Sequence, residues 1–247
     1  MDLGISGRTA LVTGASTGLG LACARALAAE GVRVALASRS VEKLAAAAAT
    51  IEGDPVVLTV DLSEPASIDA LVDDATAALG QVDILVANGG GPPPGNFAST
   101  EVDAYQAALQ LNLLSMVALT KAFVPPMQER GWGRVVAVTS AAVRQPMANL
   151  ILSNTARSGL TAFLKTTALE VAGDGVIVNT VQPGLHATDR LAQLYDDLDG
   201  VADSVPTGRL GDPGDFGRIV AFLCSESAKS IIGASVPVDS GAVKGLQ

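Results

Sequence analysis

Seven short runs of aliphatic and β-branched residues recur along the chain, and longer segments of helical character separate most of them. Within the runs, apolar and polar residues do not alternate, as expected for strands buried on both faces of a sheet. Regular alternation of strand and helix implies parallel pairing with right-handed crossovers. The predicted strands cover residues 9–13, 32–37, 56–60, 82–87, 134–139, 176–181 and 235–238.

Alanine-rich segments between the runs predict helices, because alanine has the highest helix propensity. Helices are expected over residues 18–30, 41–51 and 65–79, the last with Pro65 at its start. No low-complexity linker divides the sequence, and the Gly/Pro cluster at 89–95 is predicted to be a loop. We therefore predict one domain over residues 1–247, a doubly wound, Rossmann-like α/β fold with helices on both faces of a parallel sheet.

Two further helical segments are apolar on nearly all sides. Residues 104–128 contain a single charge, Lys121, and residues 145–169 contain only Arg157 and Lys165. Helices of this kind must be covered on both sides. The sheet would cover one side. We expect another subunit to cover the other side, and the alternative is a loop of the same chain.

Composition excludes several classes of function. The 247 residues carry a formal net charge of −9, which argues against nucleic acids and anionic membranes as partners. Two distant cysteines and a single histidine predict neither a disulfide scaffold nor a multi-histidine metal site. The first residues lack the basic start of a signal peptide, and no run of about 18 apolar residues occurs. We expect a cytoplasmic protein that binds neither metal nor membrane.

A glycine-rich turn joins the first predicted strand to the first helix, with the sequence Thr13-Gly14-Ala15-Ser16-Thr17-Gly18-Leu19-Gly20. Such a turn lets the backbone approach a pyrophosphate, and the helix N-terminus supplies free N–H groups. The spacing differs from the G-x-G-x-x-G fingerprint, so glycines that serve only the turn are an alternative. Residues 14–18 also match the G-x-S-x-G of α/β-hydrolases, but they follow the very first strand, with no other strand before it, and the only histidine is His186.

The end of the second predicted strand bears on the choice of cofactor. It carries Ser38-Arg39-Ser40, and the nearest acid is Glu42 in the next helix. A carboxylate at this point binds a ribose 2′-hydroxyl, whereas an arginine accommodates a 2′-phosphate. We therefore predict that Arg39 selects NADP(H) over NAD(H). The alternative is a surface arginine without a role.

These features and several further motifs resemble those of the short-chain dehydrogenase/reductase family, and the resemblance covers nearly the whole chain. Within that family the chain is most similar to 3-oxoacyl carrier-protein reductases. Beyond the glycine turn, the matching residues are Asp61-Leu62, Ala87-Asn88-Gly89-Gly90, Asn112, Thr139-Ser140, Pro183-Gly184, Thr188 and Val238-Asp239-Ser240-Gly241.

The resemblance implies a role for each matching residue. Asp61 and Leu62 would contact the adenine ring, and Thr188 would reach the nicotinamide amide. The other implied cofactor contacts are Asn88, Gly89, Pro183 and Gly184, and the implied catalytic residues are Asn112 and Ser140. The resemblance further implies a homotetrameric oxidoreductase that moves a hydride between NADP(H) and a small carbonyl or alcohol compound.

One catalytic motif departs from the family. Its Tyr-x-x-x-Lys begins thirteen residues after the serine, which places Ser153 and Arg157 at the two positions here. Serine is a far weaker acid than tyrosine, and arginine cannot relay protons because it stays charged. We nevertheless predict that Ser153 and Arg157 are catalytic, together with Asn112 and Ser140.

Three hypotheses follow from this departure. In the favoured one, Ser140 and Ser153 polarise a carbonyl, Arg157 stabilises the alkoxide, and water or substrate supplies the proton. The alternatives are a non-redox lyase, isomerase or cyclase, and a cofactor-binding sensor or partner subunit without activity. His186 and Tyr195 are candidate substitute acids, although packing or surface roles are favoured for both. The sequence leaves the substrate and the direction of reaction open.

Overall fold

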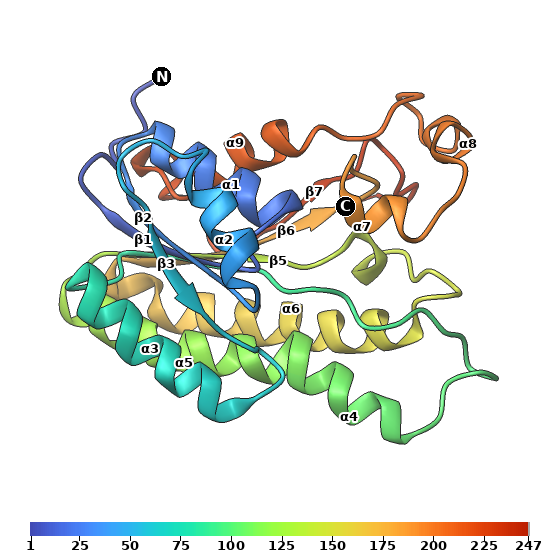
Figure 1. Ribbon diagram of the computed structural model, residues 1–247, viewed down its shortest axis with the longest axis horizontal. Coiled ribbons are helices and arrows are strands. Elements are labelled where there is room, and N and C mark those ends of the chain that lie inside the picture. The colour runs from blue at the N-terminus through green and yellow to red at the C-terminus, as the bar shows by residue number, and fades with distance from the viewer. Residues whose placement is uncertain (247) are drawn as a thin grey trace.

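In the computed structural model, which describes residues 1–246, seven parallel strands form one sheet in the order β3-β2-β1-β4-β5-β6-β7 (Figure 1). The predicted doubly wound, Rossmann-like fold is confirmed. Strand order reverses between β1 and β4, the kind of switch point at which open α/β sheets bind ligands. The strands are β1 (Thr9–Thr13), β2 (Arg33–Ser38), β3 (Val56–Thr59), β4 (Ile84–Ala87), β5 (Gly133–Val138), β6 (Val176–Pro183) and β7 (Ser235–Val238).

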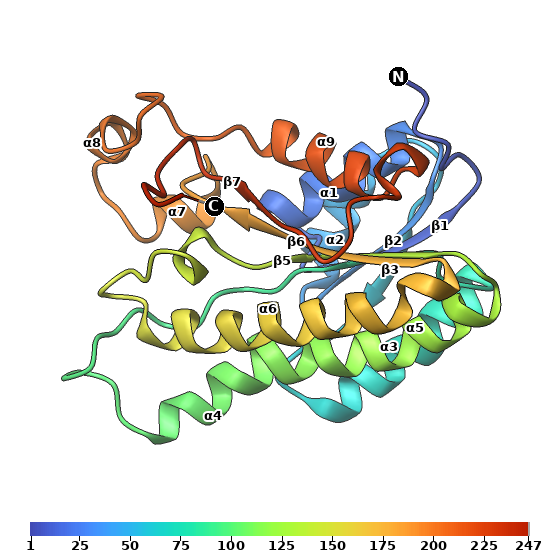
Figure 2. The same ribbon diagram turned by 180° about the vertical axis from the view of Figure 1, so that it is seen from behind.

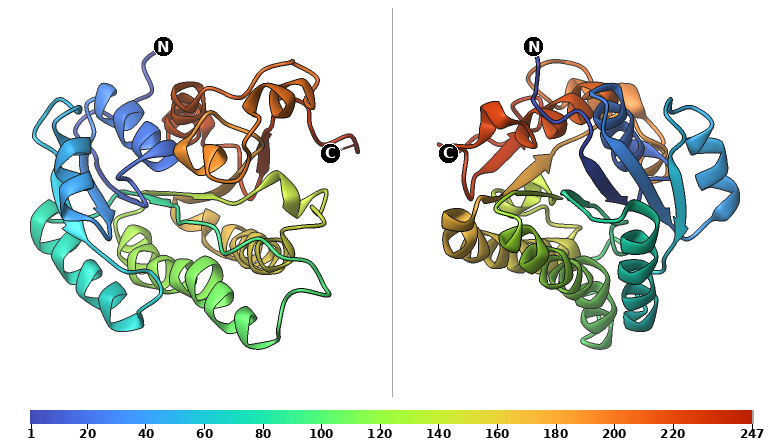
Figure 3. Two further views of the ribbon diagram at one scale, coloured as in Figure 1. Left: turned by 45° about the vertical axis from the view of Figure 1, so that its right-hand side comes forward. Right: turned by 90° about the vertical axis from the view of Figure 1, so that its left-hand side faces the viewer.

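Helices cover both faces of the sheet (Figures 2 and 3). One face carries α1 (Gly18–Ala29), α2 (Val41–Ala48) and α9 (Pro213–Leu223). The opposite face carries α3 (Pro65–Leu79), α4 (Asp103–Leu109), α5 (Ser115–Glu129) and α6 (Ile151–Val171). Two short helices, α7 (Asp189–Ala192) and α8 (Leu198–Asp203), follow β6 at its carboxyl end.

Each face of the sheet has its own hydrophobic core. In β1, Leu11 joins the core under α3, α5 and α6, whereas Ala10 and Val12 join the core under α1 and α9. This division follows from the two-residue period of a strand. It also explains why the strands are apolar throughout, because both of their faces are buried.

The predicted helix over residues 145–169 begins later than expected, at Ile151. Pro146 disfavours helix in the residue before it. The segment bonds instead to the loop after β4: Gly95 N donates to Asn149 O at 2.8 Å, and Ile151 N donates to Gly95 O at 3.1 Å. Residues 145–150 are therefore free to form one wall of a site at the edge of the sheet.

The other apolar segment is one continuous helix over residues 103–129, with a π-helical turn, η1 (Gln110–Leu114), between α4 and α5. Among the described residues, this helix is long and apolar enough to cross a membrane by length and composition, a test that a helix of a protein core also passes. Leu119, Phe123 and Met127 pack it into the core of the sheet. Leu114 is half exposed, and its cover by another subunit stays a prediction.

Because all described strands are parallel, the loops that follow them meet at one edge of the sheet. Two isolated bridges join these loops, one between Gly95 and Leu150 and one between His186 and Gly211. The loops after β1, β4, β5 and β6 thus frame a common space.

Candidate active site

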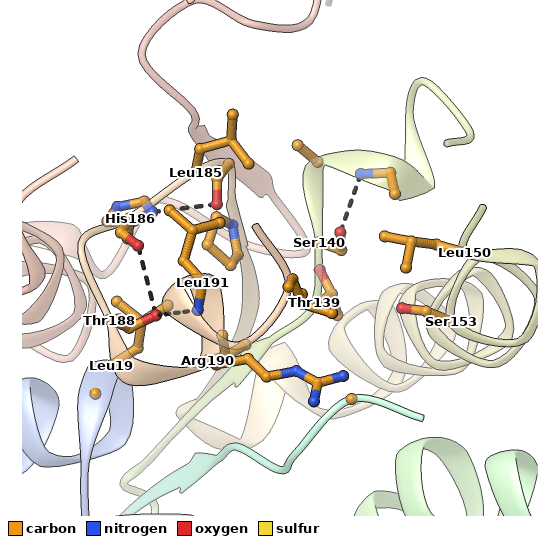
Figure 4. Close-up of a pocket in the computed structure, with 18 of the residues that line it drawn as sticks. Leu19, Thr139, Ser140, Leu150, Ser153, Leu185, His186, Thr188, Arg190 and Leu191 are labelled. Carbon is orange, nitrogen blue, oxygen red and sulfur yellow. Dashed lines mark hydrogen bonds between the residues drawn. The ribbon is translucent and has the colours of Figure 1, made fainter. Parts of the chain in front are cut away.

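A pocket of about 470 Å³ opens at the carboxyl edge of the sheet, beside the switch between β1 and β4 (Figure 4). Most of the predicted site residues line it: Gly14, Thr17, Gly18, Leu19, Asn88, Gly89, Ser140, Ser153, Arg157, Pro183, Gly184 and Thr188. Six of the predicted residues do not: Ser16, Gly20, Arg39, Asp61, Leu62 and Asn112. The structure therefore gathers most of the candidate cofactor residues and three of the four candidate catalytic residues, all except Asn112, around one cavity.

The glycine turn after β1 is shaped for an anion. Gly14 and Gly18 have φ angles of +58° and +56°, in the left-handed region that favours glycine. A Cβ on Gly20 would lie 2.2 Å from the Gly14 carbonyl oxygen, so the turn closes only with glycine there. Thr17 precedes α1 without a side-chain capping hydrogen bond. The first N–H groups of α1 are thus free at the pocket, where a pyrophosphate fits.

Asn88 joins this turn to the loop after β4. Its Nδ2 donates to the carbonyl oxygens of Thr13 and Gly14 at 3.3 and 3.2 Å. In return, the Thr13 hydroxyl donates to Asn88 O at 2.7 Å. These bonds hold two loops together at the switch point. Asn88 therefore has a structural role that does not depend on contact with a ligand.

Arg39, Asp61 and Leu62 lie beyond the pocket wall, after β2 and β3. Arg39 is exposed and Leu62 is buried. Hydrogen bonds from Ser63 lower the pKa of Asp61, and the positive charge of Arg39 lowers it further. The Ser38 hydroxyl at the end of β2 is buried without a hydrogen-bond partner among the described residues. An orphaned hydroxyl beside an exposed arginine suits a ligand that bears a phosphate.

Two serines face the pocket from adjacent walls (Figure 4). Ser140 follows β5 directly, and its Oγ accepts a hydrogen bond from Ala142 N at 3.1 Å. This bond leaves the Ser140 hydroxyl proton free to donate into the pocket. Ser153 comes from the first turn of α6 and is largely buried.

Arg157 lies one helical turn after Ser153 and is buried, with 8% of its surface exposed. Its Nη1 donates to Val138 O at 2.7 Å, and its Nη2 donates to Gly89 O at 3.2 Å. Burial lowers the pKa of Arg157 to about 10, so it is still protonated at neutral pH. Among the described residues, no acidic side chain pairs with it. The pocket therefore contains a positive charge that the chain itself does not neutralise.

Asn112 stands apart from the pocket. It lies in the π-helical turn η1, 1% exposed, and its Nδ2 donates to Ala108 O at 3.4 Å. Its Oδ1 has no hydrogen-bond partner among the described residues. π-Helical turns are frequent at functional sites, and the predicted uniform helix missed this one. The local helix geometry, rather than pocket contact, marks Asn112 as unusual.

His186 is packed rather than free. His186 is 5% exposed, its ring lies edge-on against Phe216 with the ring centroids 5.2 Å apart, and its backbone forms a bridge with Gly211. Burial is the main cause that lowers the pKa of His186, with a smaller opposing effect of its hydrogen bond to Gly184. Its neighbour Thr188 caps α7, where its hydroxyl accepts from Leu191 N. His186 thus favours the neutral form inside a packed wall.

The described residues that line the pocket include one tyrosine and no lysine. The tyrosine is Tyr195, partly buried after α7. The chain's other tyrosine, Tyr105, lies in α4 away from the pocket. Tyr195 is therefore the only phenol that the structure brings to this cavity among the described residues.

Sequence reasoning missed part of the outer wall, which includes Met147, Leu150, Arg190, Ala242 and Val243. Lys244 N donates to Gln145 Oε1 at 3.2 Å, so the end of the chain closes over residues 145–150. No local pattern reveals a contact across 99 positions. Arg190 lies two residues after Thr188, so the position of that threonine in the sequence could have pointed to it.

Comparison with known proteins shows the family to which this chain belongs. A sequence model of the family described as Enoyl-(Acyl carrier protein) reductase matches residues 14–243. Dehydrogenase/reductase SDR family member 4 of Sus scrofa is 34% identical over 249 residues, which cover 98% of this chain and 89% of that protein. The chain belongs to the short-chain dehydrogenase/reductase family, whose members are NAD(P)-dependent oxidoreductases of small carbonyl or alcohol compounds.

Two further relatives are similar to this chain over nearly its whole length. The 3-oxoacyl-acyl-carrier-protein reductase FabG of Escherichia coli is 33% identical over 240 residues, covering 97% of this chain and 98% of that protein. L-sorbose reductase of Gluconobacter frateurii, solved in complex with NADPH and L-sorbose, is 33% identical with a TM-score of 0.93 and complete coverage of both chains. The expected similarity to 3-oxoacyl carrier-protein reductases is confirmed at the level of the family.

Proposed function

We propose that this protein is an NADP(H)-dependent reductase of a small carbonyl compound with an altered catalytic set. The observation that carries the proposal is the single cavity that joins the glycine turn at Gly14 to Ser140, Ser153 and Arg157. Hydride transfer needs a dinucleotide and a carbonyl side by side. A domain spanning residues 1–247 would supply both subsites.

The cofactor lies along the edge of the sheet in this proposal. The turn from Gly14 to Gly20, with Ser16 and Thr17, holds the pyrophosphate through free N–H groups. Arg39 holds the 2′-phosphate, and Asp61 with Leu62 borders the adenine. Asn88, Gly89, Pro183, Gly184 and Thr188 surround the nicotinamide half. The NADPH bound to L-sorbose reductase supports this choice of cofactor.

The bound cofactor supplies the hydride, and the chain's own residues prepare the carbonyl. Ser140 donates a hydrogen bond from its hydroxyl to the carbonyl oxygen and keeps its proton, and its Oγ already accepts from Ala142 N. Ser153 provides a second hydroxyl from α6. Arg157 stabilises the negative charge that develops on that oxygen, because a cation held in place near a developing charge lowers the energy of the transition state. Ser153 and Arg157 occupy the positions at which we place the family's tyrosine and lysine.

The proton for the alkoxide comes from water or from Tyr195. His186 is a poor donor, since its ring is neutral and packed against Phe216. Tyr195 lines the pocket beside the α7 segment.

One observation favours a second candidate, a cofactor-binding protein without turnover. The Nη1 and Nη2 donors of Arg157 both bond to main-chain carbonyl oxygens, as they would in a purely structural role. In that case the pocket would bind NADPH and hold no competent acid.

Quaternary structure and location belong to the same proposal. We infer a homotetramer in the cytoplasm, in which the outer sides of the helix at 103–129 and of α6 meet other subunits. Half-exposed Leu114 and more exposed Leu169 support such contacts. A monomer in sedimentation velocity would contradict the inference.

The decisive experiment begins with titration of the protein with NADPH and NADH, followed by nicotinamide fluorescence. We expect at least about tenfold tighter binding of NADPH, or about 1.4 kcal/mol, and Arg39→Asp should reverse the preference. Turnover on a panel of carbonyl compounds then separates a reductase from an inactive binding protein. The double variant Ser153→Tyr with Arg157→Lys should preserve or raise reductase activity. No binding of either cofactor would overturn the proposal.

A further inference from the structure

Arg190 differs from the other arginine in the pocket wall. Arg157 is buried and has two hydrogen bonds to carbonyl oxygens. Arg190 is exposed, and its one hydrogen bond among the described residues runs from Nη2 to Pro92 O at 3.3 Å. It forms no ion pair with an acidic side chain among the described residues. Several of the five guanidinium donors of Arg190 are therefore available to a ligand.

The position of Arg190 directs those donors into the cavity. It belongs to α7, which Thr188 caps, and the neighbouring Leu191 is buried and fixes this short helix. Figure 4 shows the guanidinium extending from α7 toward the side of the pocket on which Ser153 lies. The side chain thus spans two walls that are 98 positions apart in sequence.

Glycines opposite Arg190 leave room for a bound group. A Cβ on Gly91 would lie 3.8 Å from Arg190 Nη2, and a Cβ on Gly90 would meet nothing within 4 Å. The only acid in the pocket wall, among the described residues, is Asp189, next to Arg190 in sequence. The wall otherwise carries the cations of Arg157 and Arg190, in a chain whose net charge is −9.

We propose that Arg190 is an anion-binding residue that holds a carboxylate or phosphate of a ligand lying across this pocket. A guanidinium presents a planar fork of N–H donors that matches both groups. The anion has two sources, a carboxylate on the carbonyl substrate or the pyrophosphate of the cofactor. The assignment of these ligands rests on the proposed reductase function.

The test compares Arg190→Met with Arg190→Lys, and Arg33→Met is the charge-matched control, since Arg33 is exposed at the start of β2, away from the pocket. Fluorescence titration gives the Kd of NADPH, and calorimetry gives the Kd values of inorganic pyrophosphate and acetoacetate. Turnover is measured with acetoacetate and with its neutral ethyl ester. The acid and the ester present the same ketone and differ in charge.

Each source predicts a separate pattern. With a substrate carboxylate, Arg190→Met lowers kcat/KM for acetoacetate about 10- to 100-fold and leaves the ester within about threefold. With the cofactor pyrophosphate, the Kd values of NADPH and inorganic pyrophosphate both rise by about that factor. Arg190→Lys should lie between, because it keeps the charge and loses the fork. Values within about threefold of Arg33→Met throughout would overturn the assignment.

The same experiment separates this inference from the proposed function. If the unmodified protein binds no NADPH and reduces neither ketone, the reductase proposal fails. Binding of pyrophosphate or acetoacetate that Arg190→Met abolishes would still support an anion site at Arg190. Binding that this variant leaves unchanged, or no binding of any probe, would overturn it.

Discussion

Two buried arginines stand at opposite ends of β5, and their charges are balanced in different ways. Arg134, near the amino end, is 3% exposed and pairs with Glu226 at 3.0 Å. Its guanidinium also lies 4.3 Å from the centre of the Trp132 ring. Arg157, at the carboxyl end, bonds to the carbonyl oxygen of Val138 and has no acidic partner among the described residues.

The pKa values of the two arginines differ in the same way as their partners do. Burial lowers the pKa of both guanidinium groups, but Glu226 opposes this effect at Arg134. Nothing opposes it at Arg157, whose pKa falls to about 10. An uncompensated buried charge lowers stability, and such groups cluster at functional sites. Arg134 is thus explained by the fold alone, whereas the fold does not balance the charge of Arg157, which we propose serves a ligand.

The largest expected effect comes from removing the charge of Arg157. Arg157→Met should lower kcat about 10²- to 10³-fold, the usual loss when one stabiliser of a developing oxyanion is removed. Stability should change by about 1 kcal/mol or less, because relief from burying a charge offsets the lost hydrogen bonds. Steady-state kinetics and urea denaturation measure the two effects. Arg157→Lys, which keeps a cation, is the control. Full activity in Arg157→Met would make Arg157 a structural residue.

Arg134→Met should have the opposite effects, a loss of stability without a loss of activity. Loss of the bond to Glu226 and of the stacking on Trp132 should destabilise the fold by about 2–3 kcal/mol, measured by urea denaturation. Activity per folded molecule should not change. Arg8→Met is the matched control, since Arg8 stacks on the same ring at 3.9 Å but is less buried. Its effect should stay below about 1 kcal/mol. Equal losses in the two variants would argue against the pair with Glu226.

Most of the fold could be predicted from local patterns, because a strand buried on both faces is apolar throughout. The glycine turn was predictable for a similar reason, since its backbone angles require glycine at Gly14 and Gly18. Recognising the family from the sequence required several motifs in the right order, such as Ser140 and Thr188 after their strands. No single one of these would have sufficed.

The environment of each arginine could not be predicted. Arg134 meets Glu226 across 92 positions, and Arg157 meets Gly89 across 68. Sequence spacing gives no sign of such contacts, which depend on how strands and loops assemble. The start of α6 was misplaced for the same reason, since Gly95 draws residues 149–151 into a bridge. Burial of the charge at Arg157 therefore had to be found in the structure.

A smaller effect is expected when Arg157 is given the acidic partner that Arg134 already has. Ser153→Asp places a carboxylate one helical turn before Arg157, a spacing at which opposite charges pair. We expect stabilisation by about 1 kcal/mol in urea denaturation together with weaker NADPH binding. Ser153→Asn has nearly the same shape without the charge and should show neither effect. Destabilisation by Ser153→Asp alone would mean that the charge of Arg157 is already balanced.

The smallest effect concerns His186, a base that burial leaves neutral in the same pocket. Because the pKa of His186 is lowered on folding, the unfolded chain binds its proton more readily than the folded chain does. The resulting stability is present above the ordinary pKa of about 6.5 and is lost as pH falls through the folded value, with a slope of at most about 1.4 kcal/mol per pH unit. His186→Gln should remove this component from the pH dependence of urea denaturation between about pH 6.5 and 5. The pH profile of kcat should not change, because a packed neutral ring donates no proton. A lost limb in that profile would instead make His186 the missing acid and leave Arg157 as its electrostatic partner.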